Sequence, residues 1–135
     1  MYAYLDRPVA ALPTADRVLL DAMRNWALAA TLGRDRSATA AARLPAAARA
    51  GATDALHAAM TLLDGADAAP IAFQRPCHAR VEEDEAVLLG IAALVPQNPA
   101  AATAALALLV PRATATLAVR HLATFNRRLT PALQG

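Results

Sequence analysis

Alanine and leucine dominate this chain, with 39 alanines and 20 leucines among its 135 residues. Both residue types favour the α-helix, and no segment alternates polar and apolar residues over a useful length, as a half-buried strand would. The sequence therefore predicts an all-α fold, a five- or six-helix orthogonal bundle around a central apolar helix. The length is that of one domain, so we expect a single helical domain over residues 14–135 behind an N-terminal extension of residues 1–13.

Capping residues, glycines and prolines predict where the first three helices begin and end. The first helix is expected to start at Thr14, as its N-cap, and to end at Gly33. A second helix is expected to be capped by Ser37. The remaining expectations for this half are that Pro45 and Gly51 bend or divide the second helix, that Asp54 opens a third, and that Gly65 ends it.

The same signals predict the C-terminal half. An irregular segment over residues 66–80, with a few extended residues at Ile71–Phe73, should lead into a fourth helix over residues 82–95. Asn98 is expected to cap a fifth helix with Pro99 at its first position. Pro111 either kinks this helix or opens a sixth that runs to about Leu129, with a buried stripe of Ala118, Leu122, Phe125 and Leu129.

Hydrophobic periodicity assigns faces to two of these helices. On the first, Arg17, Asp21 and Arg24 lie opposite the apolar residues, which predicts an exposed face with ion pairs at spacings i, i+4 and i, i+3. The fourth is apolar on all sides, through Leu88, Leu89, Ile91 and Leu94. A helix of this kind is usually buried, so we expect it at the centre of the bundle.

Charge is distributed in three blocks, although the net formal charge is only +2. The balance is +3 over residues 1–51, −5 over residues 52–95 and +4 over residues 96–135. Such alternation is typical of basic and acidic helices that face one another within a fold or across a dimer. The acidic centre and the scarcity of aromatic residues disfavour nucleic-acid binding, for which Arg34, Arg36 and Arg43 are the candidate phosphate contacts.

The sequence disfavours a membrane or secreted protein. Residues 86–111 carry no charge, but the turn from Pro96 to Pro99 divides them into two halves, each too short to cross about 30 Å of hydrocarbon. The N-terminus lacks the basic and apolar regions of a signal peptide. A single cysteine excludes an internal disulfide framework, so we expect a cytoplasmic bacterial protein.

One cluster of residues has the chemistry of a metal or reactive-thiol site. Cys77, His78, Glu82 and Glu85 are the candidate ligands, close to the start of the fourth helix. A structural explanation competes with this one, because acidic residues in a first helical turn oppose the helix dipole without any ligand. No paired Cys or His spacing supports a metal, so we expect no cofactor and assign no catalytic residue.

The segment from Cys77 to Leu89 resembles a pattern in small helical proteins of alphaproteobacteria, a family of unknown function. In that pattern a cysteine precedes an Asp-Glu pair and a Leu-Leu pair, matched here by Asp84-Glu85 and Leu88-Leu89. An alanine-rich helix pair follows, and residues 100–129 fit it in composition. The resemblance covers the C-terminal half and implies no activity.

Together these observations predict a non-enzymatic interaction or regulatory module with a protein partner that the sequence does not identify. Because the fifth helix has no charged side, we also expect a homodimer, with Leu106 and Leu109 on its surface of contact. Two alternatives remain. One is a thiol- or metal-responsive sensor around Cys77 and His78, and the other is a weak nucleic-acid-binding protein that uses the N-terminal arginines.

Overall fold

The computed structural model describes residues 2–66 and 70–134, which form six α-helices and three short 3-10 helices, with no strand. The all-α prediction is therefore confirmed. The α-helices are α1 (Thr14–Leu32), α2 (Arg36–Ala41), α3 (Arg49–Asp64), α4 (Glu83–Leu94), α5 (Pro99–Leu106) and α6 (Arg112–Gln134). The 3-10 helices cover Tyr2–Tyr4, Val9–Ala11 and Ala46–Ala48.

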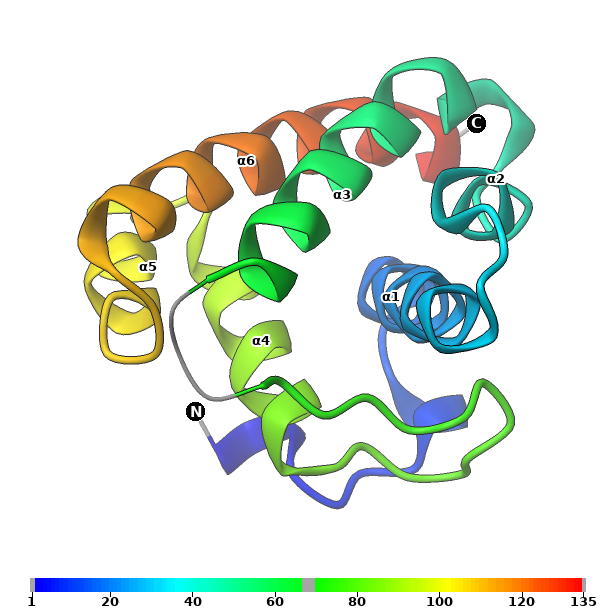
Figure 1. Cartoon of the computed structure of the whole chain (residues 1–135), viewed down its shortest axis with the longest axis horizontal. Coiled ribbons are helices and arrows are strands. Elements are labelled where there is room, and N and C mark those ends of the chain that lie inside the picture. Colours follow the sequence, from blue (N-terminus) through cyan, green and yellow to red (C-terminus); the bar gives the residue numbers. More distant parts are fainter. Residues whose placement is uncertain (1, 67–69, 135) are drawn as a thin grey trace.

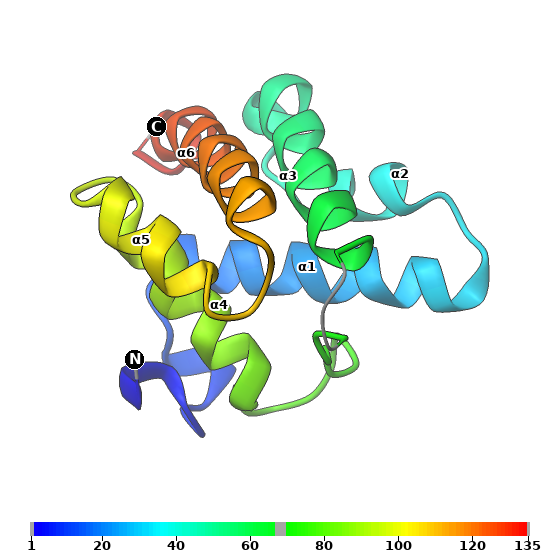
Figure 2. The same cartoon turned by 60° about the vertical axis from the view of Figure 1, so that its left-hand side comes forward.

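α3 and α6 form an antiparallel pair that α1 crosses steeply (Figure 1). α3 and α6 run side by side in opposite directions, so that Gly51 near the start of α3 lies against Arg128 near the end of α6 (Figure 1). α1 is seen almost end-on in the same view, and therefore crosses both of them steeply. Figure 2 shows α1 beneath α3 and α6, with α4 and α5 toward its first turns.

The core is built from leucines and small residues contributed by every long helix. Leu20 of α1, Leu56 of α3 and Leu89 of α4 are completely buried. On α6 the expected apolar stripe is buried at all four positions, Ala118, Leu122, Phe125 and Leu129. α6 therefore packs against the core along the face that the periodicity predicts.

α4 departs from its expected position in one respect. Leu88, Leu89 and Ile91 are buried as expected, but Leu94 in the last turn is 39% exposed. The turn through Pro96 to Asn98 ends α4 immediately afterwards, so its C-terminal end reaches the surface. None of the helices within the described residues has the length and hydropathy that crossing a membrane requires.

The boundaries expected at Gly33, Gly65, Asn98 and Pro111 match the structure. Gly33 follows α1 with a φ of 68°, the left-handed conformation that favours glycine at a helix end. Asn98 caps α5, since its side chain accepts a hydrogen bond from the Ala101 amide at 3.1 Å. Pro111 separates α5 from α6 instead of kinking one continuous helix.

Four expected details were wrong. Thr14 is the first residue of α1 and makes no side-chain cap. Asp35, not Ser37, caps α2, because its carboxylate accepts a hydrogen bond from the Ala38 amide at 2.9 Å. The other two errors concern lengths: α3 begins at Arg49, where a 3-10 turn leads directly into it, and α6 extends past Leu129.

The N-terminal segment, expected as an extension, packs against the segment that precedes α4. The amide of Asp6 donates to the Val81 carbonyl and the amide of Val81 donates to the Arg7 carbonyl, both at 2.9 Å. The Val9 amide adds a bond of 2.8 Å to the Ala79 carbonyl. Residues 70–82 themselves are irregular, as expected, whereas residues 67–69 of that expectation lie outside the described part of the chain.

Candidate functional site

The acidic cluster at the start of α4 begins with a capping box. The side chain of Glu82 accepts from the backbone at Glu85, and the side chain of Glu85 accepts from the amide of Glu82 at 3.1 Å. This reciprocal pair satisfies two backbone donors that no helical partner can reach. It also points the Glu85 side chain back toward the preceding segment.

Glu85 forms a buried, two-pronged ion pair with Arg24 of α1. Arg24 Nε donates to Glu85 Oε2 at 2.7 Å, and Nη2 donates to Oε1 at 2.8 Å. The side chains are 1% and 0% exposed. Arg24 was expected on the exposed face with Arg17 and Asp21, and that prediction was wrong because its guanidinium finds a carboxylate 61 residues further along the chain.

The remaining polar atoms of this pair fix the segment before α4. Arg24 also donates to the carbonyls of His78 and Arg80, each at 2.8 Å. Glu85 Oε2 accepts from the Gln74 amide at 3.0 Å. One buried pair therefore connects α1, α4 and the irregular segment, and every buried charge has the hydrogen bonds it needs.

Electrostatics at Glu85 follow from these contacts. Burial alone would raise the pKa of the Glu85 carboxyl, but the hydrogen bonds from Arg24 and from two backbone amides outweigh it. The pKa therefore lies below its ordinary value, and Glu85 is ionised at neutral pH. An ionised carboxylate with both oxygens occupied by arginine and amide donors serves as a structural anchor.

The four candidate metal ligands do not come together as one donor set. Glu85 is engaged as described, and His78 Nε2 lies 2.7 Å from Glu82 Oε1 on the surface. Cys77 is exposed, contrary to the buried position that lone cysteines usually take, and lines an open hollow with Arg75 and His78. No group of three potential metal ligands occurs within the described residues.

Two of the three candidate nucleic-acid contacts are paired with carboxylates. Arg43 Nε donates to Asp21 Oδ2 at 2.7 Å. Arg36 Nη1 lies 3.6 Å from Asp64 Oδ2, while its guanidinium stands 5.1 Å from the centre of the Trp26 ring. Arg34 is exposed after the end of α1.

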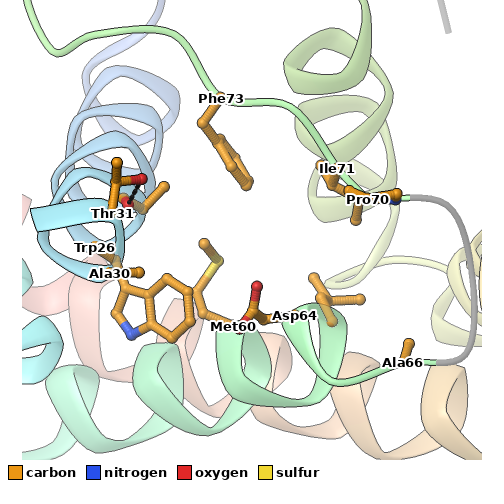
Figure 3. A pocket seen from close by; sticks show the side chains of 11 residues that line it. Trp26, Ala30, Thr31, Met60, Asp64, Ala66, Pro70, Ile71 and Phe73 are labelled. Carbon is orange, nitrogen blue, oxygen red and sulfur yellow. Dashed lines mark hydrogen bonds between the residues drawn. The ribbon is translucent and has the colours of Figure 1, made fainter. Parts of the chain in front are cut away.

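A cavity of about 320 Å³ opens between α1, α3 and the irregular segment (Figure 3). Trp26 and Met60 are on one side of it, and Phe73 and Ile71 face them across the open space. The volume lies at the lower end of the range of about 300–1,000 Å³ for small-molecule sites. No local pattern in the sequence predicts this cavity, because its lining side chains come from two helices and the irregular segment.

The acidic cluster at the start of α4 also supports the outer wall of this cavity. Asp84 Oδ2 accepts a hydrogen bond from the Ala72 amide at 2.7 Å, and Glu85 Oε2 accepts one from the Gln74 amide, two residues further along. The backbone from Ala72 to Gln74, on either side of Phe73, is therefore fixed by two neighbouring carboxylates. Glu85, a candidate metal ligand, thus helps to position the wall of this cavity instead.

The indole of Trp26 is held in one orientation. Its Nε1–H donates to His57 Nδ1 of α3 at 3.0 Å, which requires that nitrogen of the imidazole to be unprotonated. Trp26 is 2% exposed, so the ring forms a rigid wall of the cavity. Asp64 and Thr31 are its polar lining side chains, and the Thr31 hydroxyl donates to the Ala27 carbonyl at 3.2 Å.

A second hollow, of about 200 Å³, lies between α1, α4 and α6, next to Asp16. The Tyr4 hydroxyl donates to Asp16 Oδ2 at 3.2 Å. Burial raises the pKa of the Asp16 carboxyl above its ordinary value, although the bond from Tyr4 opposes that shift. Burial, with the nearby Asp16 carboxylate, likewise raises the pKa of Tyr4.

The turn between α5 and α6 exposes two leucines, which we call the leucine corner (Leu108 and Leu109). Leu108 is 82% exposed and Leu109 is 42% exposed. Leu109 also lines a hollow of about 110 Å³ with Ile71, Val87 and Asp84. Leu106, expected on the surface beside Leu109, is completely buried, since it lies on the face of α5 that packs into the core.

The comparisons with known proteins assign no function to this chain, so a function has to be inferred from the geometry. No family model, curated protein or solved structure matches the chain. The resemblance to the alphaproteobacterial pattern therefore stays a prediction. Three features remain from which a function can be inferred: the cavity beside Trp26, the anchored segment next to it and the leucine corner.

Proposed function

We propose that the protein is a non-enzymatic interaction module that pairs with a second copy of itself through the leucine corner. The observation that carries this proposal is the exposure of Leu108, at 82%, beside the half-exposed Leu109. A single exposed leucine is ordinary, but two adjacent ones beside an apolar hollow are typical of a contact surface. A second molecule would cover these side chains and remove their surface from water.

The exposed side of α5 extends this apolar surface. Ala100 and Ala104 are exposed and four residues apart, so both project from one side of α5, and Leu108 follows in the turn directly after this helix. α5 carries no charged residue at all. A helix facing only solvent usually carries a charged side, and its absence here favours a covered position.

Charge at the edges of the leucine corner favours a two-fold arrangement. Asp84 lines the hollow beside Leu109, and the exposed Glu83 is its neighbour at the start of α4. On the other side, the exposed Arg112 begins α6 three residues after Leu109. A two-fold axis through the corner would bring the acidic edge of each copy toward the basic edge of the other.

Light scattering on a sizing column at low and high micromolar concentration tests this proposal. We expect the mass of two chains at high concentration, and Leu108→Glu should return it to one chain because the new charge would be buried at the contact. Leu32→Glu is the matched control, since Leu32 is 52% exposed at the end of α1 and lies outside the leucine corner. Leu106→Glu is unsuitable, because Leu106 is buried within the chain.

The mass of one chain at both concentrations would reject self-association. Dissociation by Leu32→Glu as well as Leu108→Glu would reject the leucine corner as the contact. Both substitutions replace exposed side chains, so far-UV circular dichroism should report an unchanged fold for each.

The alternative functions receive less support from the geometry. For a metal sensor, Glu85 is committed to Arg24 and Glu82 to His78, so that Cys77 lacks those two partners. For nucleic-acid binding, the ion pairs of Arg36 and Arg43 would compete with phosphate. A cytoplasmic location remains the proposal, on the argument from the single cysteine.

A further inference from the structure

We propose that the cavity between α1 and α3 binds a small organic cation: an apolar, preferably aromatic body that carries one ammonium or similar group. This inference concerns a site separate from the leucine corner and does not depend on self-association. It rests on three properties of the cavity, namely its aromatic walls, the helix ends near it and the carboxylate of Asp64.

The walls suit an apolar body. Trp26 and Met60 are buried side chains of α1 and α3, and Phe73 stands opposite them with open space between (Figure 3). Trp26 is fixed by its bond to His57, and the backbone around Phe73 is fixed by Asp84 and Glu85. The site is therefore largely preformed, which lowers the entropic cost of binding.

The helix ends around the cavity select a positive charge. The lining residues Ala30 and Thr31 belong to the last turn of α1, and Leu63 and Asp64 to the last turn of α3. The C-terminal end of a helix carries a partial negative charge, because its last carbonyls have no partner within the helix. Residues of the last turn of both helices line the flanks of the cavity, so the partial negative charge of both ends lies near it and favours a cation.

Side chains add to this preference. Asp64 contributes the only ionisable group among the described lining residues, and that group is a carboxylate. The ring quadrupole of Phe73 attracts a ligand cation, whereas the Trp26 ring is 2% exposed and already stands beside the Arg36 guanidinium. An anionic ligand would meet a carboxylate and two unfavourable helix ends, so the same geometry disfavours it.

The chain already places one of its own cations beside this site. The guanidinium of Arg36 stands 5.1 Å from the centre of the Trp26 ring and 3.6 Å from Asp64 Oδ2. Arg36 is not part of the cavity lining, so the space beside Met60 and Phe73 remains open to a second group. A ligand ammonium would share Asp64 with Arg36, as carboxylates often accept from two donors.

Titration of the protein with three matched probes tests the proposal. The probes are 2-phenylethylammonium, the neutral 2-phenylethanol and the anionic 3-phenylpropanoate, which share one aromatic body and differ in charge. The chain has a single tryptophan, so the Nε1–H resonance of Trp26 in a nitrogen-15 spectrum reports occupancy without ambiguity. We expect saturable shifts with the cation, and an affinity about tenfold above that of the neutral probe.

Three variants test which residues determine the charge selectivity and the affinity of the cavity. Asp64→Asn should weaken cation binding by only about threefold and leave the neutral probe unchanged, because the Asp64 carboxylate is 59% exposed and solvent screens its charge. Asp54→Asn is the matched control, an exposed carboxylate at the other end of α3, and should change neither affinity. Phe73→Ala should weaken all three probes, since it removes the wall that their shared body contacts.

Three outcomes would overturn the proposal. One is the absence of any saturable shift of the Trp26 resonance with the cation. Another is equal or tighter binding of the neutral or anionic probe. The last is unchanged cation selectivity in Asp64→Asn, which would show that the charge preference, if present, comes from elsewhere.

Discussion

The buried pair of Arg24 and Glu85 is the most informative interaction at the scale of single residues. Removing two charges from water is costly, so a buried ion pair is not by itself evidence of stability. Here the two side chains also bond to the backbone of His78, Arg80, Gln74 and Glu82. Their contribution is therefore specificity, since they fix an otherwise irregular segment against two helices.

Arg24→Met is expected to lower the free energy of unfolding by about 3–5 kcal/mol, because it leaves Glu85 buried without its counter-ion. Arg43→Met is the control, since the Arg43–Asp21 pair is exposed and worth about 1 kcal/mol or less. Urea denaturation of both variants measures the difference. Equal losses for the two would mean that the buried pair is no more important than a surface one.

Removing both charges at once separates the penalty of an unpaired buried charge from the loss of the backbone hydrogen bonds that the pair makes. The double variant Arg24→Met, Glu85→Leu leaves no buried charge and should recover part of the loss. Its segment over residues 74–80 should nevertheless exchange amide hydrogens faster, because the backbone bonds of the pair are gone. Unchanged exchange there would contradict the role in positioning.

At the scale of whole elements, the sequence predicted helices best where a specific residue ends or begins them. Gly33 and the Asn98–Pro99 pair mark boundaries by their own backbone chemistry, and the structure places them as expected. The start of α3 has no such residue, since Arg49 follows a 3-10 turn of alanines and needs no cap. Local signals therefore predict boundaries only where a local interaction forms them.

The central position of α4 leads to a test by substitution. Leu89→Asp and Ile91→Asp should each unfold the protein, since both side chains are buried and a buried unpaired carboxylate costs several kcal/mol. That cost is comparable with a total stability of about 5–15 kcal/mol for a domain. Leu94→Asp, at a position 39% exposed on the same helix, should retain a cooperative thermal transition.

Circular dichroism on heating distinguishes these variants. Native-like transitions in Leu89→Asp and Ile91→Asp would mean that α4 is not the centre of the core. Loss of structure in Leu94→Asp would mean that the end of α4 is more deeply packed than its exposure indicates.

At the scale of the whole molecule, the site was less predictable than the fold. Helical periodicity requires only neighbours along the chain, and it predicted the faces of α4 and α6. The cavity, in contrast, combines residues from α1, α3 and the segment after residue 70. Nothing local in the sequence pairs Trp26 with Phe73, or Arg24 with Glu85, because those contacts arise only when distant elements cross.

The stability of the whole molecule toward acid depends on two carboxylates that act in opposite directions. The pKa of Glu85 is lowered, mainly by its hydrogen bond from Arg24 acting against burial, so the unfolded chain binds the extra proton first. The stability that ionised Glu85 contributes is therefore complete above the ordinary glutamate pKa. It is lost as pH falls through the pKa of Glu85 in the folded protein. The pKa of Asp16 is raised by burial, so the folded protein binds this proton more tightly than the unfolded chain. Protonation of Asp16 as pH falls therefore increases the free energy of unfolding.

Glu85→Gln and Asp16→Asn separate these two effects. We expect Glu85→Gln to be less stable than the parent by about 1–3 kcal/mol near pH 7, since the bonds from Arg24 lose their charged acceptor. That deficit should shrink as pH falls, because the parent also loses its carboxylate charge. Asp16→Asn should show the opposite trend, with its advantage over the parent greatest near neutrality and absent in acid. Urea denaturation at several values between about pH 7 and pH 3 measures both trends, and a constant offset across that range would contradict either assignment.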